Sequence, residues 1–234
     1  RAKLVDNIKT INKNNNKNIN LDELFSYNWD NFSENKKEFY LDFETIDKNM
    51  NNLTGKTDQY IFMIGIGWED NNKWNYKCFY LKKLTVADEK NMLNDFFNFL
   101  KNKKQEYTQI PILLHWTKAE PNFLKKSCNK HNMNINYNNI CFFDLYDLFI
   151  DNYISIKGCF NYSLKNVARA MYNTNMIKTV WDKNNECSDG LNAMYYALEY
   201  YKKRNNDVIN SIINYNEIDC KVMYEILYFI RNYN

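Results

Sequence analysis

The segment Phe39-Tyr40-Leu41-Asp42-Phe43-Glu44 is a short apolar run interrupted and ended by acidic residues. Side chains alternate along a strand, so Asp42 and Glu44 share one face, about 7 Å apart along the backbone. Burying Asp42 in a sheet is costly unless a cation or a hydrogen-bond donor compensates its charge. Taken alone, the pair is also compatible with a carboxylate that caps the loop at Thr45. The segment predicts a strand that carries either functional acids or a cap.

Two further segments predict that this strand opens a three-strand antiparallel meander. Residues 60–68 are continuously apolar, which is typical of a strand buried on both faces. The polar residues 69–72 predict a hairpin turn into residues 74–81, where apolar and polar side chains alternate as in an outer strand.

Helices and strands alternate in the rest of the chain. Strands are predicted over 110–115 and 140–143, and helices over 88–101, 120–130, 144–150, 163–172, 191–201 and 207–231. Crossover connections should make the fourth and fifth strands parallel to the first. We therefore expect an α/β fold with a mixed five-stranded sheet, a three-strand antiparallel meander plus two parallel strands, flanked by helices.

The composition indicates one folded domain with a short appendage. Of the 234 residues, 45% are hydrophobic and 17% aromatic, which excludes a disordered chain. The net charge of +3 neither supports nor excludes a phosphate-bearing partner, because such binding depends on a local groove. Residues 1–37 are polar and predict a leader or inter-domain connection that packs through Phe25, Tyr27 and Trp29. Residues 38–234 are the predicted domain.

The six cysteines form no C-x-x-C pair, which favours reduced thiols in a reducing, intracellular compartment over a disulfide framework. Cys128-x-x-His131, with Cys141 nearby, has the spacing of a zinc site, but we favour buried thiols. We see no signal peptide and no apolar run longer than about half a membrane span, so we expect a soluble protein without a membrane partner. The chain begins at Arg1, which we interpret as part of a longer protein.

The last predicted helix places an acid on its apolar face. Its apolar residues recur at spacings of three and four, and Asp219 falls within that row, one turn after Tyr215. A carboxylate on a buried stripe is explained either by a hydrogen-bonded pair or by a metal site. Together with Asp42 and Glu44, it favours a metal.

A third candidate acid follows the predicted fourth strand, in His115-Trp116-Thr117-Lys118-Ala119-Glu120. Ligands collect at the carboxyl ends of strands in α/β sheets. Glu120 is alternatively an acid that complements the dipole of the helix it starts, with Pro121 at a favourable first-turn position.

Together these segments resemble the DEDD (DnaQ-like) exonuclease superfamily of the RNase H-like fold. The resemblance is nearest to the RNase H-like nuclease domain attached to RecB-family (Cas4-like) nucleases and helicases, and it covers about residues 38–231. Glu120 stands where the wider superfamily has Asp, and Tyr215 four residues before Asp219 resembles the tyrosine subclass. The matching segments, in the same order, are residues 40–44, 60–67, 115–120, 143–145, 162–165 and 215–220.

The resemblance implies an RNase H-like sheet and a metal-dependent 3′–5′ exonuclease that hydrolyses DNA or RNA at single-stranded ends with two Mg²⁺ or Mn²⁺ ions. Asp42 would bridge both ions, Glu44 and Asp219 would complete the first site, and Glu120 would hold the second. Tyr215 would orient or help to deprotonate the attacking water. Oxygen-only ligands favour Mg²⁺ or Mn²⁺ over zinc.

The residues that could contact the substrate have two interpretations each. Lys118 and Lys165 could meet backbone phosphates, and Trp116 or Tyr162 could stack on a terminal base. Trp116 is alternatively sheet-end packing, and the lysines are alternatively solvated surface. We expect His115 to have a structural or phosphate-contacting role rather than to act as the general base. Asp144 is expected to cap its helix or to support the metal site.

Two other functions use the same residues differently. A non-catalytic RNase H-like module would position nucleic acid or a partner for a fused RecB-type nuclease or helicase domain. A structure-specific endonuclease would share the metal chemistry and differ only in its products.

Overall fold

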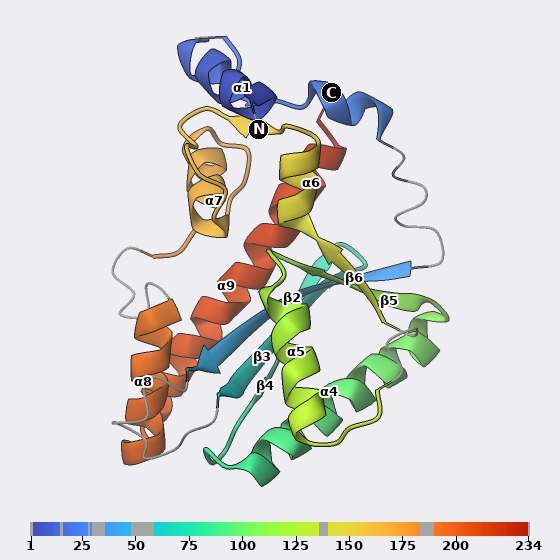
Figure 1. The fold of residues 1–234 in the computed structure, drawn as a ribbon, viewed down its shortest axis with the longest axis vertical. Helices are drawn as coiled ribbons and strands as arrows, with labels where there is room; N and C mark the ends of the chain where they lie inside the picture. The colour runs from blue at the N-terminus through green and yellow to red at the C-terminus, as the bar shows by residue number, and fades with distance from the viewer. Residues whose placement is uncertain are drawn as a thin grey trace.

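A mixed five-stranded sheet forms the centre of the protein in a computed structural model, which describes residues 2–14, 16–27, 29, 36–47, 59–135, 140–182 and 190–233 (Figure 1). The first three strands are antiparallel, and the last two run parallel to the first. The predicted topology is therefore confirmed. From one edge to the other, the strands are β4 (Lys73–Tyr80), β3 (Tyr60–Asp70), β2 (Lys36–Ile46), β5 (Ile110–His115) and β6 (Cys141–Asp144).

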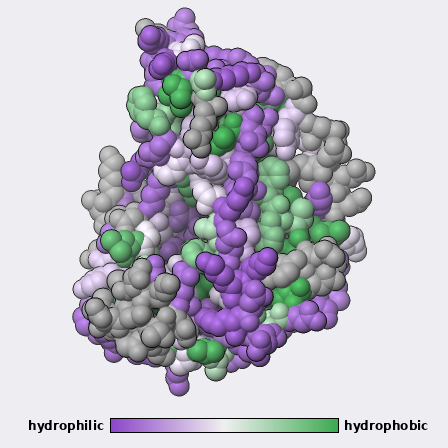
Figure 2. All heavy atoms as spheres, in the orientation of Figure 1, coloured by the Kyte–Doolittle hydropathy of each residue, from purple (hydrophilic) through white to green (hydrophobic). Residues whose placement is uncertain are grey.

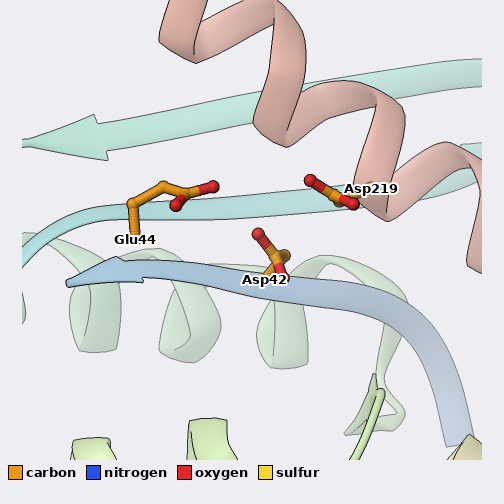
Figure 3. Close-up of side chains that lie close together, drawn as sticks. All are labelled: Asp42, Glu44 and Asp219. Atoms are coloured by element: carbon orange, nitrogen blue, oxygen red, sulfur yellow. The ribbon is translucent and has the colours of Figure 1, made fainter. Parts of the chain in front are cut away.

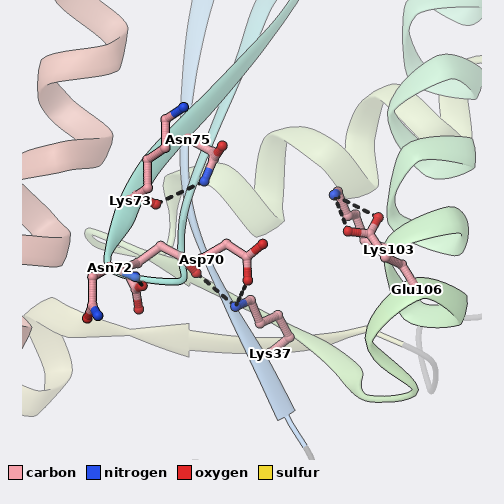
Figure 4. Close-up of polar contacts among 8 residues, drawn as sticks. Lys37, Asp70, Asn72, Lys73, Asn75, Lys103 and Glu106 are labelled. Atoms are coloured by element: carbon pink, nitrogen blue, oxygen red, sulfur yellow. Dashed lines mark hydrogen bonds and ion pairs between the residues drawn. The ribbon is translucent and has the colours of Figure 1, made fainter.

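The hairpin between β3 and β4 turns at Asn71 and Asn72, as predicted. Both residues have positive φ angles, 51° and 61°, as a type I′ turn requires at its two central positions. Lys37 of β2 supports this end of the sheet: its Nζ donates to the Glu69 carbonyl at 2.8 Å and lies 3.7 Å from Asp70 (Figure 4).

One face of the sheet is covered by α4 (Val86–Tyr107) and α5 (Ala119–Lys130). Alternation along β2 turns Phe43 to this face, where its ring contacts that of Phe96 of α4 edge-on, with centroids 6.5 Å apart. The middle strand β3 is buried from Tyr60 to Trp68, as its continuous apolar run predicted.

The opposite face is covered by α8 (Gly190–Lys203) and α9 (Asn206–Arg231), with α9 lying across β2 and β3. Tyr40 of β2 points to this side, and its ring meets that of Tyr224 with centroids 5.6 Å apart. The apolar residues that recur at spacings of three and four along α9 form the face that contacts the sheet, as predicted. All residues of this row from Ile212 onward are buried. No helix in the described ranges is long and apolar enough to cross a membrane.

The N-terminal residues pack against the segment that leads into α7 (Leu164–Asn173), as the upper left of Figure 1 shows. β1 (Ile19–Asn20) pairs antiparallel with β7 (Ser155–Ile156), and the 3-10 helix η1 (Asp22–Ser26) follows β1. Tyr27 and Trp29 are half-buried against the core, and the side chain of Phe25 lies outside the described residues. The remaining helices are α1 (Ala2–Lys13) and α6 (Leu145–Asp151).

A buried carboxylate joins α4, α5 and the start of β3. Glu89 is fully buried; its Oε1 accepts from the Ile61 amide at 2.9 Å and from Ser127 at 3.2 Å. Its Oε2 pairs with Lys130 and, at 2.8 Å, with His131. His131 therefore belongs to this network, and neither Cys128 nor His131 belongs to a metal-binding cluster among the described residues.

We predict that Glu89→Ala lowers the free energy of unfolding by about 3 kcal/mol, because it leaves buried partners without their charge and acceptor. Urea denaturation measures the change. The control is Glu106→Ala on the same helix, whose side chain is 51% exposed and pairs with Lys103 at 2.8 Å (Figure 4). That variant should change stability by less than about 0.5 kcal/mol. Equal effects of the two substitutions would contradict the structural role of Glu89.

Candidate active site

Three carboxylates from two distant segments meet at the end of β2. Asp42 and Glu44 project from the same face of β2, and Asp219 projects toward them from α9 (Figure 3). One oxygen from each carboxylate lies within 4.8 Å of the other two. The alternation of β2 and the three-and-four periodicity of α9 are the local causes of this arrangement.

The β2–β3 pairing is irregular beside the cluster. Glu44 pairs with Met63, whereas Thr45 pairs with Ile61, so one residue of β3 is left over. Such a bulge bends a strand and increases its twist, and bulges are common beside functional sites. Here it reshapes the end of the sheet where Glu44 faces α9.

Asn216 holds the two acids of β2, and the sequence analysis did not identify it as a site residue. Its side chain is fully buried, and Nδ2 donates to Asp42 Oδ2 at 2.7 Å and to Glu44 Oε1 at 3.4 Å. Its Oδ1 accepts from the Tyr76 hydroxyl at 2.9 Å. One feature of the sequence could have identified this residue: Asn216 places an amide on the buried face of the last helix, one turn before Asp219.

Gly65 makes room for this amide. A Cβ at position 65 would lie 1.5 Å from Asn216 Oδ1 and 2.8 Å from the Tyr76 hydroxyl oxygen. The absence of a side chain in β3 is therefore what lets Asn216 approach β2.

Glu120 approaches the cluster from α5 without joining its tight core. The turn that precedes it contains Thr117 with φ of 71°, a left-handed conformation uncommon outside glycine. Glu120 is buried, and its Oε2 has no hydrogen-bond partner among the described residues, with His115 Nδ1 3.7 Å away. The negative charge of Glu120 nevertheless acts on the cluster, because it raises the pKa values of Asp42 and Glu44.

The carboxyl groups hold protons more tightly than free acids do. Burial raises the pKa of Glu44 to about 8, with the Asp219 charge contributing, and burial likewise raises the pKa of Glu120 to about 8. The pKa values of Asp42 and Asp219 lie well above the usual range, first through burial and then through repulsion from Glu44 and from Asp42, respectively.

Lys165 and Tyr215 moderate this negative charge. Lys165, near the start of α7, lies with its Nζ 4.7 Å from the centre of the Tyr215 ring. Its charge lowers the pKa values of Asp42, Glu44 and Asp219. The Tyr215 hydroxyl hydrogen-bonds Asp219, which also lowers the pKa of that carboxyl.

A cavity of about 360 Å³ opens over the cluster. Its walls come from β2, the β5–α5 turn, the start of α7, the start of α8 and α9. The lining residues are Asp42, Phe43, Glu44, Trp116, Thr117, Ser163, Leu164, Lys165, Gly190, Tyr215 and Asp219.

The structure places the four residues named as nucleic-acid contacts in different surroundings. Lys118 is exposed outside the cavity lining and pairs with Asp147 at 3.3 Å. Tyr162 is buried, its hydroxyl donates to the Ile154 carbonyl at 2.6 Å, and its ring contacts that of Phe149 with centroids 6.2 Å apart. Trp116 donates from Nε1 to the Tyr162 carbonyl at 2.8 Å, so it packs at the sheet end while lining the cavity. Among the described residues that line the cavity, Lys165 is the one with a cationic side chain, and it lies close to the acids.

His115 and Asp144 support the turn before Glu120. His115 is buried, which lowers its pKa, and its Nδ1 hydrogen-bonds the Thr117 carbonyl. Asp144 Oδ1 accepts from the amides of Thr117 and Tyr146, both at 2.9 Å. Asp144 thus caps α6, as expected, and also fixes the turn.

The donor set fits a hard divalent cation. All four candidate ligands are carboxylates, and oxygen ligands suit Mg²⁺ or Mn²⁺. Buried acids with raised pKa values and a buried Glu120 oxygen without a hydrogen-bond partner are groups that a cation would satisfy.

Comparison with known proteins finds one family. A sequence model of the RNase H superfamily matches residues 39–230 of the chain. No curated protein matches the chain.

We predict that Gly65→Ala lowers the free energy of unfolding by about 2 kcal/mol or more and weakens Mn²⁺ binding, because the added methyl displaces Asn216 from Asp42. Urea denaturation and titration calorimetry measure the two effects. Gly190→Ala is the matched control for stability, since a Cβ there meets nothing within 4 Å among the described residues, and the free energy of unfolding should be unchanged or slightly raised. Unaltered Mn²⁺ affinity in Gly65→Ala would count against the role of Asn216.

We also predict how pH affects metal-free protein. Between about pH 4.5 and 8, unfolded Glu44 is ionised while native Glu44 keeps its proton, so the native state binds more protons. The free energy of unfolding should therefore fall across this window relative to that of Glu44→Gln, and then level off. Denaturation in EDTA at a series of pH values tests this, and a difference that stays constant with pH would contradict it.

Proposed function

The chain belongs to the RNase H superfamily, and from this we propose that it is a metal-dependent nuclease that hydrolyses phosphodiester bonds of DNA or RNA as a 3′–5′ exonuclease. The observation that carries the proposal is the approach of Asp42, Glu44 and Asp219 to within 4.8 Å, with Glu120 beside them. Buried acids gathered in this way, on the wall of an open cavity, destabilise the protein unless a cation uses them.

We assign Asp42, Glu44, Asp219 and Glu120 as the ligands of two Mg²⁺ or Mn²⁺ ions. Bound divalent cations supply the charge that stabilises the attacking and leaving oxygens of a phosphodiester. Asn216 supports this set by holding Asp42 at 2.7 Å, so that the carboxylates need little rearrangement on binding.

The remaining polar groups of the cavity act on the substrate side. Lys165 places a positive charge beside the acids, where it attracts a phosphate. Tyr215 is assigned to orient the attacking water, because its hydroxyl bonds Asp219 and its ring is held under Lys165. His115 is too buried and too firmly bonded to Thr117 to serve as a general base in this role.

The finer classification rests on the same residues. Tyr215 lies four residues before Asp219, and α9 contains no histidine, which supports the tyrosine subclass of DEDD exonucleases. A fused or associated RecB-type nuclease or helicase remains a proposed partner, supported by the sequence resemblance.

We predict that Asp42→Ala and Asp219→Asn each reduce Mn²⁺-dependent nucleotide release at least about 100-fold, because each removes a charge that the reaction requires. Labelled single- and double-stranded DNA and RNA are incubated with the protein and Mn²⁺ or Mg²⁺. Circular dichroism checks the fold. Asp95→Asn, at an exposed position of α4, is the control and should keep full activity.

The products separate the remaining possibilities. Release of mononucleotides that stops when the 3′ end is blocked supports the exonuclease, whereas internal cuts in end-blocked strands indicate an endonuclease. Full activity in Asp42→Ala would contradict the assigned site. Tight binding of nucleic acid and Mn²⁺ with no cleavage of any substrate would indicate a non-catalytic module.

A further inference from the structure

The loop between β7 and α7 carries an aromatic ring that the core does not use. Phe160 is 74% exposed, the largest value among the exposed large hydrophobic residues of the described chain. The loop leads directly into Ser163, Leu164 and Lys165, which line the active-site cavity. Phe160 and Ser163 are three positions apart in the chain, a span of at most about 11 Å. The loop therefore holds the backbone of Phe160 near residues that line the cavity.

The N-terminal elements hold this loop from one side. Asn12 of α1 accepts a hydrogen bond at Oδ1 from the Gly158 amide at 2.8 Å. The Lys157 amide donates to the Asn18 carbonyl at 2.8 Å, and Lys157 Nζ donates to the Asn14 carbonyl at 2.9 Å. These bonds continue the β1–β7 pairing, and we call α1 and β1 together the N-terminal clamp.

The start of α7 holds the loop from the other side. Asn161 Oδ1 accepts from the Ser163 amide at 3.1 Å and from the side chain of Asn166. Cys159 is tied by its amide to the Ile156 carbonyl at 3.0 Å and by its thiol to the Asn161 carbonyl at 3.0 Å. The backbone on both sides of Phe160 is thus held while its ring faces solvent.

A rigid backbone with an exposed ring is the arrangement that binds a flat, apolar partner at low entropic cost. In the orientation of Figure 1, Figure 2 shows hydrophobic side chains at the surface in the region of α1, β7 and α7. Lys157 precedes the ring and Lys165 follows it, so cationic side chains lie on both sides of it in the chain. Aromatic rings interleaved with cations are typical of surfaces that bind single-stranded nucleic acid.

We propose that Phe160 stacks on a base of single-stranded nucleic acid that enters the cavity, and that the N-terminal clamp positions this ring. The proposal rests on the nuclease function proposed above and names the single strand as its substrate form. The clamp lies outside residues 39–230, so it adds a substrate-binding element to the RNase H superfamily domain.

The test compares Phe160→Ala with Phe160→Trp, each in an Asp219→Asn background that prevents cleavage. Fluorescence anisotropy measures the Kd for a labelled single-stranded oligonucleotide at one fixed salt concentration. Phe160→Ala should raise the Kd about 5- to 10-fold, and Phe160→Trp should stay within about twofold of the parent. Tyr228→Ala, which removes a 58% exposed ring from α9, is the control and should leave the Kd unchanged.

Asn12→Ala tests the clamp separately. It should speed hydrogen exchange at the Gly158 amide and raise the Kd by a smaller factor than Phe160→Ala does. In the double variant, Asn12→Ala should add little to the effect of Phe160→Ala, because both act through one ring. Fully additive effects, or unchanged exchange at Gly158, would overturn the positioning role.

The outcomes distinguish the two proposals. If the wild-type protein cleaves single strands while Phe160→Ala has the same Kd as its Asp219→Asn parent, the stacking site is overturned and the nuclease function stands. If the parent binds no nucleic acid with Mn²⁺ present, both are overturned.

Discussion

Burial of four carboxyl groups beside one another is the constraint on which the rest of the site depends. Burial disfavours the charged form and neighbouring like charges repel, so the pKa values of the four carboxyl groups rise. The protein offsets the charge with the amide of Asn216, the hydroxyl of Tyr215 and the ammonium of Lys165. These donors come from α9 and α7, which explains why both helices must reach the end of β2.

The same features build the sheet and the site. Phe43 points to α4 while its neighbours Asp42 and Glu44 point to α9, so a single strand anchors the core on one face and presents acids on the other. Gly65 in β3 provides the space that Asn216 fills, and the Tyr76 hydroxyl from β4 completes the contact. A change in the packing of these three antiparallel strands would therefore also displace the carboxylates.

Much of the fold could be predicted because its signals are local. The continuous apolar run of β3, the Asn71–Asn72 turn and the periodic row of α9 each follow from neighbouring residues. Glu89 escaped prediction because its partners lie 28 to 42 positions away in sequence, and no short pattern marks a buried acid that is paired. Tyr162 was named for stacking because its motif is visible in sequence, whereas its burial is not.

By itself, the sequence determined the order of the strands and the four candidate acids, because alternation and helical periodicity are properties of short segments. Only the tertiary structure decided that Asn216 meets Asp42 across 174 positions, that Lys118 lies apart from the acids, and that the N-terminal residues hold the loop of Phe160. Such contacts depend on the register and packing of segments far apart in the chain, and these are set by the whole core rather than by any one stretch.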